Sequence, residues 1–157
     1  MVTIKIKNDT ITPALEALAR QMGDMSDVMN DIGMALVASS EKRLDAGVSP
    51  VGSAFAPRSP VTIKVYQRRG ISFGGVLHKS GKLRQNIFHT YGPEHVEIGS
   101  VEPYAAMMQF GGTQAQFPNL WGNIPARPFL GVSDQDETDI LDILAEWAER
   151  AAAAGGA

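Results

Sequence analysis

Three histidines are the side chains in this sequence best suited to metal binding or proton transfer. His78, His89 and His95 do not share the spacing of a metal-binding motif, and carboxylates at useful steps are absent around them. The chain has no cysteine, which removes disulfides, thiolate nucleophiles and cysteine-ligated zinc. We therefore expect no metal site.

The nearest approach to a phosphate-binding loop is Gly75 followed by Gly81 and Lys82. The spacing is one residue too long, and Leu83 stands where a magnesium-binding hydroxyl is required. The acids near the C-terminus could supply a pair for acid–base catalysis, but a solvated helix face is the simpler interpretation. These patterns predict a protein without catalytic activity and without a cofactor.

Arg127 and Phe129 form the most distinctive candidate for a contact site. Both lie beside prolines, at 125 and 128, whose fixed φ angles would hold the guanidinium group and the aromatic ring in place. A second interpretation is that Phe129 and Leu130 fill the core while Arg127 binds a local carboxylate. The sequence leaves both roles open, because an edge segment can serve either purpose. If the contact role holds, Arg127→Ala or Phe129→Ala should impair assembly with a partner.

The elements that would position these residues begin with a strand at 1–7, where apolar and polar residues alternate. Thr12 followed by a proline predicts a helix start, with Thr12 as the capping residue. The helix should run to about 44–47, with a break or bend at 23–24. Its apolar residues recur at steps of three and four, which favours a core-facing helix over a coiled-coil seam: Leu15, Leu18, Met22, Met25, Met29, Ile32 and Leu36.

Residues 47–75 are rich in proline and glycine and show no helical period, so they predict a long mobile arm. Within the arm, 61–66 could form a short strand or a turn of helix, and the sequence does not decide between them.

The second half of the chain predicts several short elements and one long helix. A turn at 80–83 should lead into a short helix, and 87–91 with 95–99 should form a hairpin. A short helix is expected at 103–110, an extended edge segment at 126–132, and a last amphipathic helix capped by Ser133. Residues 151–157 should fray. This order predicts an α+β fold in one domain, 1–157, with a small antiparallel sheet packed against the long N-terminal helix and the C-terminal helix.

Charge is distributed unevenly along the chain. The net charge is −3, yet no acidic residue occurs between Ala46 and Pro93. That stretch holds seven bases: Arg58, Lys64, Arg68, Arg69, Lys79, Lys82 and Arg84. The last predicted helix instead holds seven acids before its first base: Asp134, Asp136, Glu137, Asp139, Asp142, Glu146 and Glu149.

This asymmetry favours contact between neighbouring copies, in which the basic arm of one meets the acidic helix of the next. The candidate contacts are Arg68 and Arg69 on the basic side and Asp139 and Asp142 on the acidic side. The alternative is that the basic segment binds nucleic acid, with interleaved aromatic residues stacking on bases. The acidic pI, about 5.6, speaks against that alternative.

Four segments in this order resemble the phage virion morphogenesis family, the tail-completion proteins of Mu-like phages and prophages (protein G type). They are 49–62, 76–83, 96–100 with 104–112, and 124–131. Val51 and Phe55 stand where the family usually has Asp and Trp, and Met108 where it often has a histidine. No residue-level role is carried over to those positions.

The resemblance implies a non-enzymatic structural protein that completes the tail or neck so that head and tail can join. Its expected partners are other copies of itself in a ring-like homo-oligomer and other tail, neck or head proteins. The expected location is the host cytoplasm during assembly and then the virion. No membrane partner is expected, since no apolar run approaches the roughly 20 residues of a membrane span.

Overall fold

The structure is a computed structural model that describes residues 2–5 and 11–155 of the chain. Helices α1 (Thr12–Met22) and α2 (Ser26–Ala46) occupy the stretch predicted as one long helix. They separate at Gly23, whose φ of 73° a glycine adopts at little steric cost, so the expected break is confirmed. The residue that precedes α1 is Ile11 and not the predicted cap Thr12, which is already helical.

The apolar face of these two helices lies in the core. Leu18, Met25, Met29, Ile32 and Leu36 are all buried there. The core-facing interpretation of this periodicity is therefore correct.

The sheet has three antiparallel strands in the order β1-β3-β2, formed by β1 (Val2–Lys5), β2 (Ile87–Tyr91) and β3 (Val96–Ser100). Strands β2 and β3 form the predicted hairpin, with Tyr91 opposite Val96. Strand β1 pairs with β3 and confirms the expected N-terminal strand over residues 2–5. The other residues of that prediction lie outside the described part of the chain.

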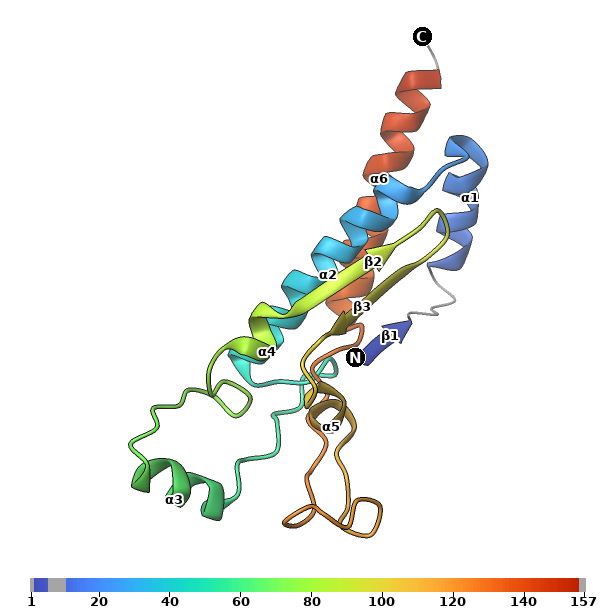
Figure 1. Ribbon diagram of the computed structural model, residues 1–157. Coiled ribbons are helices and arrows are strands. Elements are labelled where there is room, and N and C mark those ends of the chain that lie inside the picture. Colours follow the sequence, from blue (N-terminus) through green and yellow to red (C-terminus); the bar gives the residue numbers. More distant parts are fainter. Residues whose placement is uncertain (1, 6–10, 156–157) are drawn as a thin grey trace.

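Helix α2 lies directly on the sheet, and helix α6 (Asp134–Gly155) packs on the other side of α2 and against α1 (Figure 1). The approach of α2 to β2 requires Gly33, because a Cβ there would lie 2.3 Å from the His89 ring. Between α6 and α2, the Trp147 indole N–H donates to Asp31 Oδ2 at 2.9 Å. Sheet and helices thus form the predicted α+β fold.

The sheet and helices α1, α2 and α6 form the body of the protein. Two segments project from the end of the body that lies opposite the C-terminus (Figure 1). The first is the arm, residues 47–75, which contains helix α3 (Pro60–Arg68) and returns to the body through α4 (Lys82–Gln85). The second is a loop, residues 111–125, which follows α5 (Ala105–Phe110). We call it the aromatic loop.

The structure settles one open alternative and corrects one expectation about these elements. The undecided segment 61–66 is helical within α3, where the Ser59 hydroxyl accepts from the Thr62 N–H at 3.1 Å and caps the first turn. Residues 126–132 form no strand, for a reason given below. Helix α6 extends through residue 155, residues 156–157 lie outside the described chain, and the fraying of 151–157 stays a prediction.

Within the described residues, no helix is both long enough and apolar enough to cross a membrane.

Candidate assembly surfaces

Phe129 lies in the core, with 0% of its surface exposed, and Leu130 is 1% exposed. The backbone N–H groups of both residues donate to the Gln109 side-chain oxygen at 3.0 Å, and the Gln109 amide donates to the Leu130 carbonyl at 3.0 Å. The buried Gln109 thus takes the place of a neighbouring strand, which explains why this extended segment joins no sheet. Of the two roles left open for Phe129, the structure supports the core role.

Arg127 binds the arm and not a carboxylate. Its Nε donates to the Ala56 carbonyl at 2.7 Å and its Nη2 to the Pro57 carbonyl at 2.8 Å, and the residue is 7% exposed. Burial, and then the nearby charge of Arg58, lowers the pKa of Arg127, but a guanidinium remains charged at neutral pH. Arg127 therefore fastens the first residues of the arm to the body.

Sequence reasoning missed a buried ion pair between Arg43 and Asp136. The Arg43 Nη1 lies 2.7 Å from Asp136 Oδ2, and their side chains are 7% and 3% exposed. Arg43 also donates to the carbonyls of Phe129 and Gly131, at 3.2 and 2.9 Å. This network joins α2, α6 and residues 129–131, which precede α6. Asp136 is therefore not part of the solvated acidic face to which the sequence assigned it.

Several groups compete to set the pKa of Asp136. Burial acts to raise it, but hydrogen bonds from Ser39, Ser133 and Arg43 outweigh burial and lower the pKa below its usual value. The Ser133 hydroxyl accepts from the Asp136 N–H at 3.1 Å, and the Ser133 N–H donates to Asp136 Oδ2 at 2.8 Å. This reciprocal pair is a capping box at the start of α6, and it confirms Ser133 as the cap.

The arm has a small packed cluster of its own. The Arg58 guanidinium lies 4.7 Å from the Phe73 ring centre and 5.7 Å from that of Tyr66, and it donates to the carbonyls of Gly74 and Gly75. Lys79 Nζ lies 5.1 Å from the Tyr66 ring centre. Two of the bases in the basic stretch are thus held against aromatic faces, which leaves those faces less open to a nucleic-acid base.

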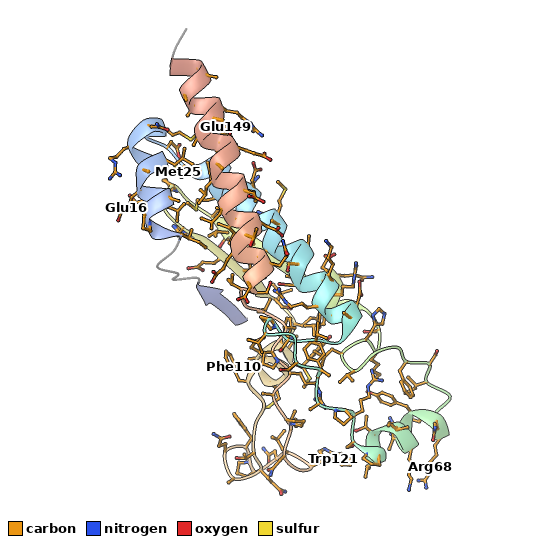
Figure 2. The ribbon with its side chains drawn as sticks, turned by 180° about the vertical axis from the view of Figure 1, so that it is seen from behind. Glu16, Met25, Arg68, Phe110, Trp121 and Glu149 are labelled. Carbon is orange, nitrogen blue, oxygen red and sulfur yellow. The ribbon has the colours of Figure 1, made fainter. Side chains whose placement is uncertain are left out.

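Other bases of the arm point to solvent. Lys64, Arg68 and Arg69 are exposed, and within the described chain none of them forms an ion pair. The acids Asp139 and Asp142 are likewise exposed on α6. Figure 2 shows Arg68 at one end of the molecule and Glu149, further along α6, toward the other. Arg68 and Glu149 therefore lie far apart within one chain.

The residues that could have done chemistry have structural partners or lack the required context. His89 Nε2 lies 2.9 Å from Asn30 Oδ1. Residues 70–74 match the Gly-x-Ser-x-Gly pattern of hydrolases, but they follow the end of α3 and do not connect a strand to a helix. In the described part of the chain, no three histidine or carboxylate side chains are grouped so that they could hold a metal ion.

The fold and these surfaces define a small α+β protein with a packed body and two projections at one end. Residues 6–149 match the model of the phage virion morphogenesis family. The chain therefore belongs to that family.

Two relatives support this assignment. The chain is 30% identical to the Mu-like prophage FluMu G protein 2 of Haemophilus influenzae, over 94% of this chain and 96% of the relative. It is 32% identical to the putative capsid assembly protein G of Escherichia phage Mu, over 70% of each chain. No solved structure matches the protein significantly.

Proposed function

We propose that this protein is a non-enzymatic structural subunit that completes the tail or neck of a phage particle, so that head and tail can join. Its membership of the virion morphogenesis family and its similarity to a protein named as a putative capsid assembly protein support this function. It would act in the host cytoplasm during assembly and then in the virion, together with other tail, neck or head proteins.

The observation that carries the proposal is that exposed bases gather on the arm and exposed acids on α6. Lys64, Arg68 and Arg69 lie on the arm, and Asp139 and Asp142 lie on α6. Among the described residues these opposite charges form no ion pair within one subunit, and they can pair between two. Each copy would present its arm to the α6 face of the next, and a head-to-tail contact of this kind closes into a ring when the rotation permits.

The buried polar groups support a scaffold function. Among the described residues, every buried side-chain nitrogen or oxygen has a hydrogen-bond partner within the protein. Arg43, Asp136, Gln109 and Arg127 all hold backbone segments or helix ends in place. Polar side chains are used here to fix the shape of the subunit.

Nucleic-acid binding through the basic 46–93 segment remains the second candidate, because Lys64, Arg68 and Arg69 are exposed on one short helix and its end. The contacts of Arg58 with the Tyr66 and Phe73 rings and of Lys79 with the Tyr66 ring cover part of the stacking surface that such binding would use.

Deletion of the gene from its phage or prophage tests the proposed function. We expect lysates of the deletion strain to contain separate filled heads and tails by electron microscopy, and complementation to restore joined particles. Native mass spectrometry of the purified protein should show a closed oligomer. Joined infectious particles in the deletion lysate would contradict the proposal, whereas loss of DNA binding without loss of oligomers in Arg68→Glu/Arg69→Glu would favour the second candidate.

A further inference from the structure

The second projection carries no charge. From Pro103 to Ala126 the chain has no Asp, Glu, Lys or Arg, although charged residues make up 20% of the whole sequence. Four large aromatic side chains in this stretch are exposed: Tyr104 at 42%, Phe110 at 66%, Phe117 at 48% and Trp121 at 102%. Protein interfaces are depleted of charge at their centres and enriched in Trp, Tyr and Phe, and Trp is a frequent hot-spot residue.

The aromatic loop is held in a defined shape despite its exposure. Gly112 and Ile124 exchange backbone hydrogen bonds of 2.9 and 2.7 Å at its base. Gly111 has a φ of 68°, and a Cβ there would lie 2.6 Å from the Ile124 carbonyl oxygen. Near the tip, the Gln114 N–H donates to the Asn123 side chain at 3.0 Å. A preorganised loop presents its side chains without a large loss of entropy on binding.

The same chain offers a recess that an indole would fit. A hollow of about 270 Å³ lies between the end of α2 and the start of α6. The hollow is wide open to solvent, so a flat aromatic ring can reach its floor from outside. Its walls combine apolar residues and glycine (Ala46, Val48, Pro50, Gly52), the serines 39, 49 and 133, and the bases Lys42 and Arg43. Tryptophan suits such a wall, because its ring is apolar and its one N–H can donate to a hydroxyl group.

The position of the hollow agrees with the proposed head-to-tail contact. Ser133 lines the hollow, and Asp139 follows six residues later on α6, about 9 Å along the helix at 1.5 Å per residue. The arm and the aromatic loop project from the same end of the molecule (Figures 1 and 2). A neighbour whose arm meets Asp139 and Asp142 would therefore bring its loop toward the start of α6.

We propose that the aromatic loop is an interaction surface for a second copy of this chain, and that Trp121 of one copy enters the hollow beside Ala46 of the next. This inference rests on the proposed function, because it uses the same head-to-tail arrangement. The loop carries no cation that could bind phosphate, so a nucleic acid is a poor occupant. A bilayer is the competing partner, because exposed tryptophan also favours membrane interfaces.

Cross-linking of single-cysteine variants tests this contact, since the chain contains no cysteine of its own. Gly122→Cys places a thiol beside Trp121 without removing the ring, and a Cβ there meets no atom within 4 Å. Ala46→Cys places a thiol at the exposed rim of the hollow. Tyr91→Cys, at the hairpin end and 48% exposed, is the matched control. Equal amounts of two variants are mixed under oligomer-forming conditions and treated with a short bis-maleimide.

We expect a cross-linked product between Gly122→Cys and Ala46→Cys in clear excess over either variant alone, and none above background with Tyr91→Cys. Trp121→Ala should weaken self-association by about tenfold or more, while Tyr91→Ala should leave it unchanged. An oligomer that forms without the 122–46 product overturns this inference and leaves the proposed ring intact. Failure to form any oligomer overturns both. Trp121-dependent flotation with phosphatidylglycerol vesicles, without the 122–46 product, would assign the loop to a membrane instead.

Discussion

At the residue scale, Phe129 shows how a side chain that could have been a contact is used for stability. Its ring is fully buried, and its N–H is held by Gln109. We predict that Phe129→Ala lowers the free energy of unfolding by about 3–5 kcal/mol, through the lost burial and the cavity left behind. Urea unfolding followed by circular dichroism measures this change. Phe110→Ala, which truncates a ring that is 66% exposed, is the control and should cost less than about 0.5 kcal/mol.

A soluble Phe129→Ala protein of unchanged stability that fails to assemble would return Phe129 to the role of a contact.

The Arg43–Asp136 pair predicts a specific dependence of stability on pH. The folded protein lowers the pKa of Asp136, so the carboxylate contributes stability that is complete above its unfolded pKa of about 3.9. That contribution is lost as the pH falls through the lower folded pKa. We predict that Asp136→Asn destabilises the protein at pH 7, because it leaves Arg43 buried without a counter-charge. The difference from the wild type should then shrink below about pH 4.

Unfolding curves at a series of pH values from neutral to acid measure this difference, with the exposed Asp142→Asn as the control. A difference between wild type and Asp136→Asn that stays constant down to the lowest pH would show that the ionised pair adds nothing to stability.

At the scale of elements, the connection between Arg127 and the arm is the feature most open to a direct test. Arg127 donates two hydrogen bonds to carbonyls at residues 56 and 57, where the arm leaves the body. Each charge-assisted bond contributes about 1.5–3 kcal/mol. We predict that Arg127→Ala raises amide exchange rates across 47–75 by roughly ten- to a hundredfold, and leaves those of α2 unchanged. Hydrogen exchange read by mass spectrometry measures both segments.

The exposed Arg69→Ala serves as the control for loss of an arginine from the arm. In the wild-type monomer we still expect the arm to exchange faster than α2 and to become protected on assembly. Strong protection of 47–75 in a confirmed monomer would contradict that expectation, and the Arg58 cluster would then be sufficient to hold the arm.

The correct predictions concern features that are determined by residues close together in the sequence. The hairpin followed from two alternating runs around a Gly-Pro turn, the cap of α6 from Ser133, and the break between α1 and α2 from Gly23. Each of these features is decided within a few residues of the chain.

The predictions that were wrong concern residues whose partners are distant in the sequence. Residues 126–132 looked like a strand because nothing local reveals that Gln109 supplies their hydrogen bonds. Asp136 looked like a solvated acid because its partner Arg43 lies on α2. A single polar residue within an apolar stretch, as Gln109 is between Met108 and Phe110, was the one available signal of a buried polar network. The charged candidate contacts, Arg68, Arg69, Asp139 and Asp142, were chosen from the distribution of charge along the sequence. No knowledge of the fold was needed to find them.

At the scale of the whole molecule, the two projections share one end and α6 runs away from them toward the C-terminus (Figure 1), and the proposed ring brings these surfaces together between copies. The arm offers unpaired cations, the aromatic loop offers an uncharged surface, and α6 offers exposed acids next to a hollow. In an interface of this kind, charge sets the approach and the register, while a buried aromatic residue supplies most of the binding energy. The two contributions should respond differently to salt.

Charge reversal tests the electrostatic part. We predict that the double variant Arg68→Glu/Arg69→Glu slows association by roughly ten- to a hundredfold at low salt without lowering the free energy of unfolding. Both residues are exposed and, among the described residues, form no ion pair, so their reversal should not disturb the monomer. Adding Asp139→Lys and Asp142→Lys to the same chain restores opposite charges across the interface and should recover part of the association.

Wild-type association should weaken with salt, because exposed charges are screened beyond about 8–10 Å at ordinary ionic strength. Sedimentation velocity of the three proteins at low and high salt measures these effects. Oligomers that respond neither to salt nor to reversal would leave the asymmetry as a solubility feature, and the ring would then have to depend on the aromatic loop alone.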